Sequence, residues 1–176
     1  IVSAIFYLIF IIGTSFDIKG ERYFTLVDDA MISMRYARNL AQGHGLVWNI
    51  GEPPVEGFTN LGWTLYLAFL HFFPFPASKI SLAVMLTSLV ILLANIHTIS
   101  KIAEALQPDS KYTSTLAAIV TAFYFPLVFW SLRGMEVGLL TWLISLAILF
   151  SLTEKRPVFI GILFAAAILV RVDAIV

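Results

Sequence analysis

Five long apolar runs, separated by short polar stretches, dominate the pattern of this chain. A helix needs about 20 mostly apolar residues to cross a bilayer, and these runs approach or reach that length. They cover residues 1–16, 80–100, 112–130, 136–152 and 158–176. The pattern therefore predicts an all-α polytopic membrane protein with five spanning helices.

A sixth apolar run, over residues 61–75, is shorter and rich in aromatic residues, and Pro74 and Pro76 end it. We expect this run to lie along the membrane interface as a helix rather than to cross the bilayer. A second interfacial helix is expected at about residues 29–42, where small and apolar residues recur every three or four positions and Gly43 provides a stop.

The short basic loops support this topology. If residues 61–75 do not span, Lys101, Lys111, Lys155 and Arg156 all fall on one side of the membrane. Basic residues in short loops mark the cytoplasmic side. We therefore expect the long polar loop of residues 17–79 to be extracytoplasmic, together with the turn that precedes residue 136.

Composition agrees with a membrane protein. Of 176 residues, 60% are hydrophobic and only 12% are charged, whereas a soluble domain is about a quarter charged. The formal net charge is zero, which argues against a nucleic-acid partner. The absence of cysteine excludes disulfides and Cys-ligated zinc. Because the chain begins and ends inside apolar runs, we expect it to be the N-terminal part of a longer protein.

Two adjacent carboxylates, Asp28 and Asp29, follow the first apolar run. One of them suits the N-terminus of the helix that follows, where capping contributes about 1 kcal/mol. Capping explains the second carboxylate poorly, because two neighbouring anions repel each other. The alternative is a functional pair, in which one carboxylate is a general base and the other tunes it or binds a divalent cation.

The same loop carries further candidates, each with a simpler interpretation beside it. Arg35 and Arg38 can bind a phosphate through their guanidinium groups, or merely contact lipid headgroups. His44, between two glycines, can contact a substrate or make a local hydrogen bond. Glu56 is a possible second acid of the site, and Asn60 is expected to cap the aromatic helix.

Charges also stand at the edges of the later apolar runs. Glu136 begins a spanning helix, where the helix dipole favours a carboxylate, yet an acid at membrane depth is a functional candidate. Arg171 and Asp173 lie two residues apart at the extracytoplasmic end of the last run. They form either an internal ion pair or a phosphate-binding arginine held by an aspartate.

The stretch DDAMISMRYARNLAQGHGLVWNIGEPPVEGFTNLGWTLYLA, Asp28–Ala68, resembles the first external loop of integral-membrane glycosyltransferases of the GT-C fold. It is most similar to the bacterial branch with arabinofuranosyl- and mannosyltransferases. Members carry an aromatic residue where this chain has Met31 and a tyrosine where it has Phe58. Neither change removes a reactive group.

Two shorter elements extend the resemblance. SLRGMEVGLL, at residues 131–140, is similar to the second external loop of the family, with Arg133 in place of a small residue and Val137 in place of threonine. RVDA, from Arg171, is similar to a later R-P-(D/E)-(G/A) element, with Val172 in place of proline. The three motifs occur in the family's order, and the first is the most specific.

The resemblance implies a GT-C transmembrane helix bundle and a reaction. Such enzymes take a sugar from a polyprenyl-phosphate carrier on the extracytoplasmic face, usually with inversion, and pass it to a glycan, lipid or protein acceptor. A carboxylate after the first helix acts as the base, which corresponds to Asp28 with Asp29 as its partner. Some members need a divalent cation and others do not, so a metal at Asp28 and Asp29 stays open.

Physical reasoning adds roles for the remaining charges. Arg171 is the first candidate to stabilise the departing phosphate, followed by Arg35 and Arg38, while Glu56 and Glu136 suit sugar hydroxyls. The expected location is the plasma membrane, with several passes through its lipid. Two other functions remain: a transporter or flippase of a lipid-linked sugar, and an inactive membrane scaffold. Neither the sugar nor the acceptor follows from the sequence.

Overall fold

A computed structural model describes residues 1–153 and 156–172, with backbone only at residue 111. The described part is mostly helical, in agreement with the predicted all-α class. One two-stranded hairpin departs from that prediction. Its elements are α1 (Val2–Gly13), β1 (Ser15–Ile18), β2 (Glu21–Phe24), α2 (Asp28–Ala41), α3 (Leu61–Leu70), α4 (Ile80–Leu106), α5 (Lys111–Phe123), α6 (Phe125–Leu132), α7 (Val137–Thr153) and α8 (Pro157–Val170).

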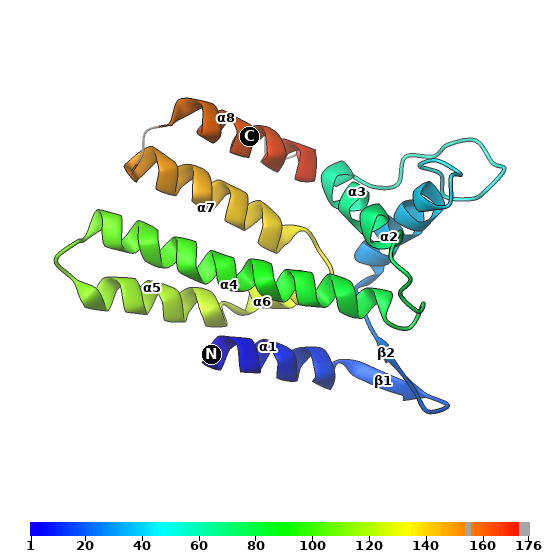
Figure 1. Ribbon diagram of the computed structural model, residues 1–176, viewed down its shortest axis with the longest axis horizontal. Helices are drawn as coiled ribbons and strands as arrows, with labels where there is room; N and C mark the ends of the chain where they lie inside the picture. The colour runs from blue at the N-terminus through cyan, green and yellow to red at the C-terminus, as the bar shows by residue number, and fades with distance from the viewer. Residues whose placement is uncertain (154–155, 173–176) are drawn as a thin grey trace.

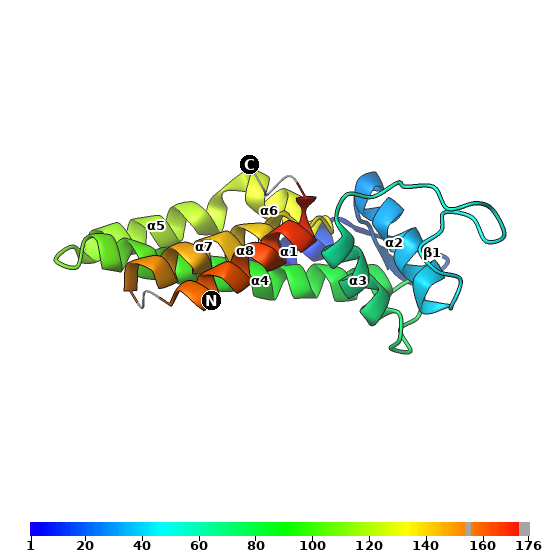
Figure 2. The same ribbon diagram turned by 90° about the horizontal axis from the view of Figure 1, so that it is seen from above.

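The molecule is elongated and has two distinct parts. Helices α1 and α4–α8 lie side by side along the long axis, while α2, α3, the hairpin and their loops gather at one end (Figures 1 and 2). The turn between α6 and α7 and the end of α8 reach the same end. The segments that carry candidate chemistry are therefore grouped together, away from the turn that joins α4 to α5.

The hairpin corrects the predicted extent of the first helix, which was expected to run to residue 16. Helix α1 ends at Gly13, and β1 pairs antiparallel with β2 across Lys19 and Gly20. Both turn residues have positive φ, 54° and 83°, as in the two-residue turns that match strand twist. The helix therefore stops three residues before its predicted end, and the first strand of the hairpin follows.

The predicted span over residues 112–130 is not one continuous helix, because it is broken at Tyr124 into α5 and α6, which meet at 48°. Pro126 lacks an N–H group and so cannot bond to the carbonyl of Ala122 four residues earlier. The hydroxyl of Tyr7 donates to that carbonyl instead, at 2.9 Å. The freed backbone group is thus satisfied by a neighbouring helix.

Among the described residues, α4 alone is long and apolar enough by itself to cross a membrane. It continues to Leu106, six residues beyond the predicted end. The bent pair α5–α6 passes the same test when its two halves are taken together. Helices α1, α3, α7 and α8 are apolar but shorter, and α8 ends at Val170 rather than continuing through Arg171.

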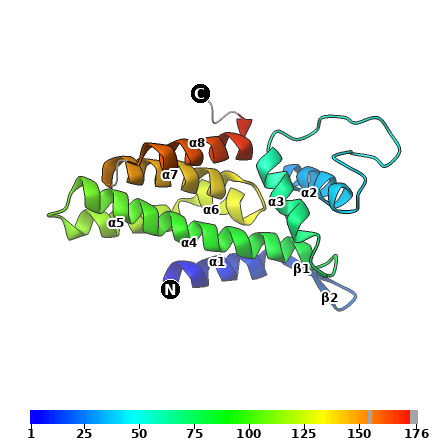
Figure 3. The ribbon, with the colours of Figure 1, turned by 45° about the horizontal axis from the view of Figure 1, so that its top comes forward.

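The two short helices at the end of the bundle agree in part with expectation. Helix α2 matches the predicted 29–42 to within one residue, whereas α3 stops at Leu70 because turns begin at His71. Helix α3 lies between α2 and the end of α8 (Figure 3). A Cβ atom at Gly62 would meet the carbonyl oxygen of Leu169 at 2.9 Å, so this close approach needs a glycine.

Candidate functional site

Four segments far apart in the sequence form one small polar pocket. Helix α2 contributes Asp29 and Ser33, the loop before α3 contributes Asn60, the turn before α7 contributes Glu136, and the end of α8 contributes Arg171. The cavity is about 260 Å³, and we call it the polar pocket. It brings together one candidate residue from each of the three motifs singled out in the sequence.

The turn before α7 is held in place by hydrogen bonds to two of its backbone carbonyls. The amide of Val27 donates to the carbonyl of Arg133 at 2.9 Å, and the indole of Trp63 donates to the carbonyl of Gly134 at 2.9 Å. Gly134 has a φ of +95°, and a Cβ atom there would meet Leu26 at 2.9 Å. Only glycine suits both this conformation and this close contact.

Arg133 secures the same turn from its other side. Its guanidinium donates to the hydroxyl of Thr25, and burial lowers the pKa of Arg133 from its ordinary value. Arginine stays charged through such a shift, because its ordinary pKa is above about 12. Its contact with Thr25 shows what this large side chain does here.

Glu136 is a buried carboxylate with two protein partners. Its side chain is 1% exposed, and Oε1 accepts from Nη1 of Arg171 at 3.1 Å while Oε2 accepts from Nδ2 of Asn60 at 2.9 Å. A buried charge is tolerated only when it is paired and hydrogen-bonded. Both oxygens of Glu136 therefore accept hydrogen bonds from groups inside the protein.

Asn60 does not cap α3 through its side chain, contrary to the expectation from the sequence. It occupies the N-cap position, yet its side chain makes no capping hydrogen bond. Its Oδ1 instead accepts from the hydroxyls of Ser33, at 2.9 Å, and Thr64, at 3.1 Å. All of these side chains are buried, so the amide is fixed in orientation between two donors and a carboxylate.

Arg171 follows the last turn of α8 in an extended conformation, and its side chain is one-third exposed. The sequence suggested Asp173 as its partner, but Asp173 lies outside the described residues. One partner of Arg171 is Glu136, for which the sequence suggested a different role. The guanidinium therefore lies at the wall of the polar pocket with part of its surface open.

Asp28 and Asp29 occupy the first turn of α2, but neither is its cap. The N-cap residue is Val27, which has no capping side chain, and both carboxylates are exposed. Consecutive helical residues point about 100° apart, so the two side chains line different cavities. Asp29 lines the polar pocket, whereas Asp28 lines a larger one on the other side.

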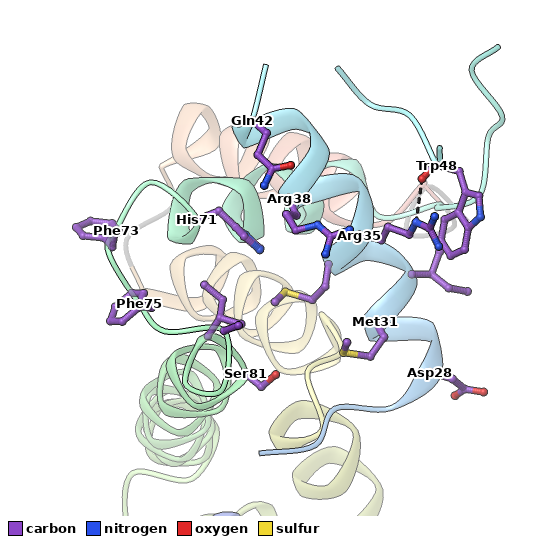
Figure 4. A pocket seen from close by; sticks show the side chains of 14 residues that line it. Asp28, Met31, Arg35, Arg38, Gln42, Trp48, His71, Phe73, Phe75 and Ser81 are labelled. Carbon is purple, nitrogen blue, oxygen red and sulfur yellow. Dashed lines mark hydrogen bonds between the residues drawn. The ribbon is translucent and has the colours of Figure 1, made fainter. Parts of the chain in front are cut away.

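The larger cavity is an apolar groove of about 800 Å³ between α2 and the segment leading into α4. Figure 4 shows Arg38 and His71 on different elements that line it, and Asp28 at its edge. Ile32 lines both this groove and the polar pocket. We call it the apolar groove; its side chains include Met31, Met34, Arg38, His71, Phe73 and Phe75.

Arg35 also lines this groove, but its guanidinium is engaged in holding the following loop. Its Nε donates to the carbonyl of Trp48 at 2.9 Å, its Nη2 donates to Oδ1 of Asn49 at 2.5 Å, and its guanidinium stacks 4.2 Å from the Trp48 ring centroid (Figure 4). Arg38, in contrast, is exposed. Both candidate arginines of α2 therefore line the groove, and Arg38 is the more exposed of the two.

The remaining candidates lie elsewhere. His44 is exposed in the loop after α2 and lines neither the polar pocket nor the apolar groove. Glu56 lines a separate hollow with Phe58, Leu61 and Val172. Among the described residues no group of three acidic or histidine side chains could hold a metal ion, and Asp28 and Asp29 diverge, which does not suit a shared cation.

No protein-family model, curated protein or solved structure matches this chain.

Proposed function

We propose that this chain belongs to a multi-pass membrane glycosyltransferase of the GT-C kind. It moves a sugar from a polyprenyl-phosphate donor to a glycan, lipid or protein acceptor on the extracytoplasmic face of the plasma membrane. One observation carries the proposal: Asp29, Glu136 and Arg171, one from each of the three family-like motifs, line a single pocket although they lie far apart in the sequence.

The surface of the bundle supports a membrane location. Large apolar side chains are exposed along its helices, among them Ile5 and Ile9 of α1, Ile119 of α5 and Ile162 of α8, all more than half exposed. Soluble monomers rarely expose contiguous apolar surface on this scale. In the proposal, lipid covers these side chains, α4 and the bent α5–α6 pair cross the bilayer, and α1, α7 and α8 complete the bundle.

The polar pocket has the groups that the reaction requires. Asp29 takes the proton of the acceptor hydroxyl, whose oxygen then attacks the anomeric carbon of the sugar. The bond from that carbon to the phosphate oxygen breaks, and the phosphate leaves with the electron pair. Arg171 stabilises the added negative charge on the phosphate. No step in this scheme requires a metal ion.

The choice of Asp29 over Asp28 as base follows from the pocket. The resemblance assigns this role to Asp28, but Asp29 is the carboxylate that shares a cavity with Arg171. In an inverting transfer the base and the leaving group must approach the same anomeric carbon from opposite sides. A cavity of about 260 Å³ lies below the size range of pockets for drug-sized ligands and suits a single sugar unit.

The apolar groove suits the rest of an amphiphilic donor. It opens beside the polar pocket across Ile32, and Met and Phe side chains supply apolar surface for a prenyl chain. Arg38 at the groove adds a cation near the expected phosphate. The proposed partners are therefore a polyprenyl-phosphate sugar and membrane lipids, and no nucleic acid.

The decisive experiment uses the full-length protein in nanodiscs with a panel of polyprenyl-phosphate sugars and membrane-extract acceptors. Wild type is compared with Arg171→Gln, and Arg22→Gln in the exposed hairpin is the control. We expect transfer from one donor, reduced about 100-fold by Arg171→Gln and unchanged in the control. Donor movement between leaflets without sugar release would indicate a flippase instead of a transferase. The absence of both activities would favour an inactive scaffold.

A further inference from the structure

We infer that Asn60 is a positioning residue, which orients the carboxylate of Glu136 and thereby sets Arg171 in the polar pocket. This inference rests on the proposed function for its catalytic consequence. It assigns a role to a side chain that the sequence treats as a helix cap, and it changes the role of Glu136 from a contact for sugar hydroxyls to a link between two protein groups.

The hydrogen bonds determine which way the Asn60 amide faces. A hydroxyl can donate or accept, and those of Ser33 and Thr64 both donate to its Oδ1. Its NH₂ group is then directed at Oε2 of Glu136, 2.9 Å away. A carboxylate can only accept, so the orientation is consistent at every contact.

The same chain of contacts limits the freedom of Arg171. With Oε2 held by Asn60, the other oxygen of Glu136 points to Nη1 of Arg171 at 3.1 Å. Asn60 and Glu136 are 6% and 1% exposed, so water does not compete for this pair. A long arginine side chain has many rotamers, and a fixed partner reduces the number it samples before a ligand arrives.

These hydrogen bonds also join four segments that are far apart in the sequence. Ser33 belongs to α2, Thr64 to α3 and Glu136 to the turn before α7, and Arg171 follows α8. Asn60 is the residue that touches the first three. A small displacement of any of these elements would therefore change the geometry around Arg171, where an error of about 1 Å can cost about 100-fold in rate.

The test is a pair of near-isosteric exchanges. Asn60→Asp places a second carboxylate against Glu136, so one acid must take a proton or the two must separate. Adding Glu136→Gln restores a donor: the new amide can donate to the carboxylate introduced at position 60 while its oxygen faces Arg171, and Ser33 and Thr64 keep their acceptor. Asn49→Asp is the matched control, because Asn49 also lies between an arginine and a glutamate, Arg35 and Glu52, but in the loop outside both cavities.

We expect Asn60→Asp to lower the rate of sugar transfer about 100-fold and the double variant to recover about tenfold of that loss. Asn49→Asp should transfer sugar as wild type does. Thermal unfolding measured on the same samples should show Asn60→Asp and the double variant within a few degrees of each other, so that recovery reflects positioning rather than refolding. Wild-type transfer by Asn60→Asp, or no recovery in the double variant, would overturn the inference.

A second measurement separates this inference from the proposed function. Binding of polyprenyl phosphate, without a sugar, is measured in nanodiscs for wild type and Asn60→Asp. If wild type binds but transfers no sugar, the transferase proposal fails; about tenfold weaker binding by Asn60→Asp then supports positioning, and equal binding overturns it. A wild-type protein that neither transfers nor binds overturns both.

Discussion

The polar pocket and the apolar groove lie on either side of the first turn of α2, and they are built in different ways. The polar pocket is assembled from four separate segments, and its buried groups are joined by hydrogen bonds at 2.9–3.1 Å. The apolar groove is lined mainly by α2 and by residues 71–81, with flexible methionines and an exposed arginine. The first is organised before a ligand binds, whereas the second can adapt to one.

The difference between the two cavities explains why two adjacent aspartates need not share a role. Asp28 and Asp29 have the same chemistry and adjacent positions, but Asp29 shares the polar pocket with Arg171, whereas Asp28 lines the apolar groove with Arg38. A reaction that develops charge benefits from groups already in place. A long apolar chain gains mainly from buried area, which depends little on exact geometry. The two cavities therefore suit the two ends of an amphiphilic substrate.

The largest expected effect separates the two carboxylates. Replacing Asp29 with Asn should reduce sugar transfer about 1,000-fold, because an amide cannot accept the proton of the acceptor hydroxyl. Replacing Asp28 with Asn should cost about tenfold or less, since Asp28 stands at the rim of the groove. Transfer rates of both variants in nanodiscs check this order. The reverse order would return the base to Asp28, as the family resemblance implies.

A smaller effect is expected in the apolar groove. Phe73 lines it and Phe72, its neighbour in the chain, does not. Phe73→Ala should raise KM about tenfold for a long-chain donor and leave kcat unchanged, because it removes binding that is equal in ground and transition states. Phe72→Ala is the matched control. A similar KM increase for a donor with a very short prenyl chain would show that the groove does not hold the chain.

The turn that presents Glu136 should depend on Trp63. Its indole donates to the carbonyl of Gly134 at 2.9 Å, and both residues are buried. Trp63→Phe keeps an aromatic ring but leaves that carbonyl without its donor, which should cost about 1–3 kcal/mol of stability. Trp130→Phe at a half-exposed ring serves as the control in thermal unfolding. Equal losses in the two variants would mean that the hydrogen bond contributes little.

The smallest effect concerns pH and lies outside both cavities. The hydroxyl of Ser78 donates to Glu21 at 2.5 Å, and this bond, followed by one from Tyr23, lowers the pKa of Glu21 below its ordinary value of 4.5. A lowered folded-state pKa gives stability that is present above the ordinary value and is lost as pH falls through the folded value.

Glu21→Gln should therefore be less stable than wild type near neutral pH, and the gap should close in acid. Thermal unfolding of both proteins at about pH 7 and about pH 3 measures this difference. A gap that stays the same at both values would show that the ionised carboxylate is not what holds the hairpin to the segment before α4.

Local patterns in the sequence were enough for some elements and not for others. Helix α2 was predicted to within one residue, because its small and apolar positions repeat at helical spacing and Gly43 follows it. The break at Tyr124 was missed although Pro126 stands in the sequence. The apolar residues continue on both sides of this proline, so the hydrophobic pattern alone predicts one helix. The hairpin was missed because its four-residue strands are short and its turn depends on a positive φ at Lys19.

The candidate site shows the same division. Asp29, Glu136 and Arg171 stood out as charges beside apolar runs, where an ionised group is costly and needs a reason. Asn60, Ser33 and Thr64 carry no charge, and such residues are common at helix ends, so the sequence offered only a cap for Asn60. Its position in the VEGFTN stretch was the signal available, and it did not indicate Glu136 as a partner.

The sequence by itself determined that most of the chain forms apolar helices and that its acids and arginines lie largely in the segments between them and in α2, because hydrophobic periodicity and charge are properties of short segments. Only the tertiary structure decided which of those charges meet. The contact between Asn60 and Glu136 spans 76 positions and that between Glu136 and Arg171 spans 35. Such pairs depend on how helices pack and where turns bend, which no local pattern encodes.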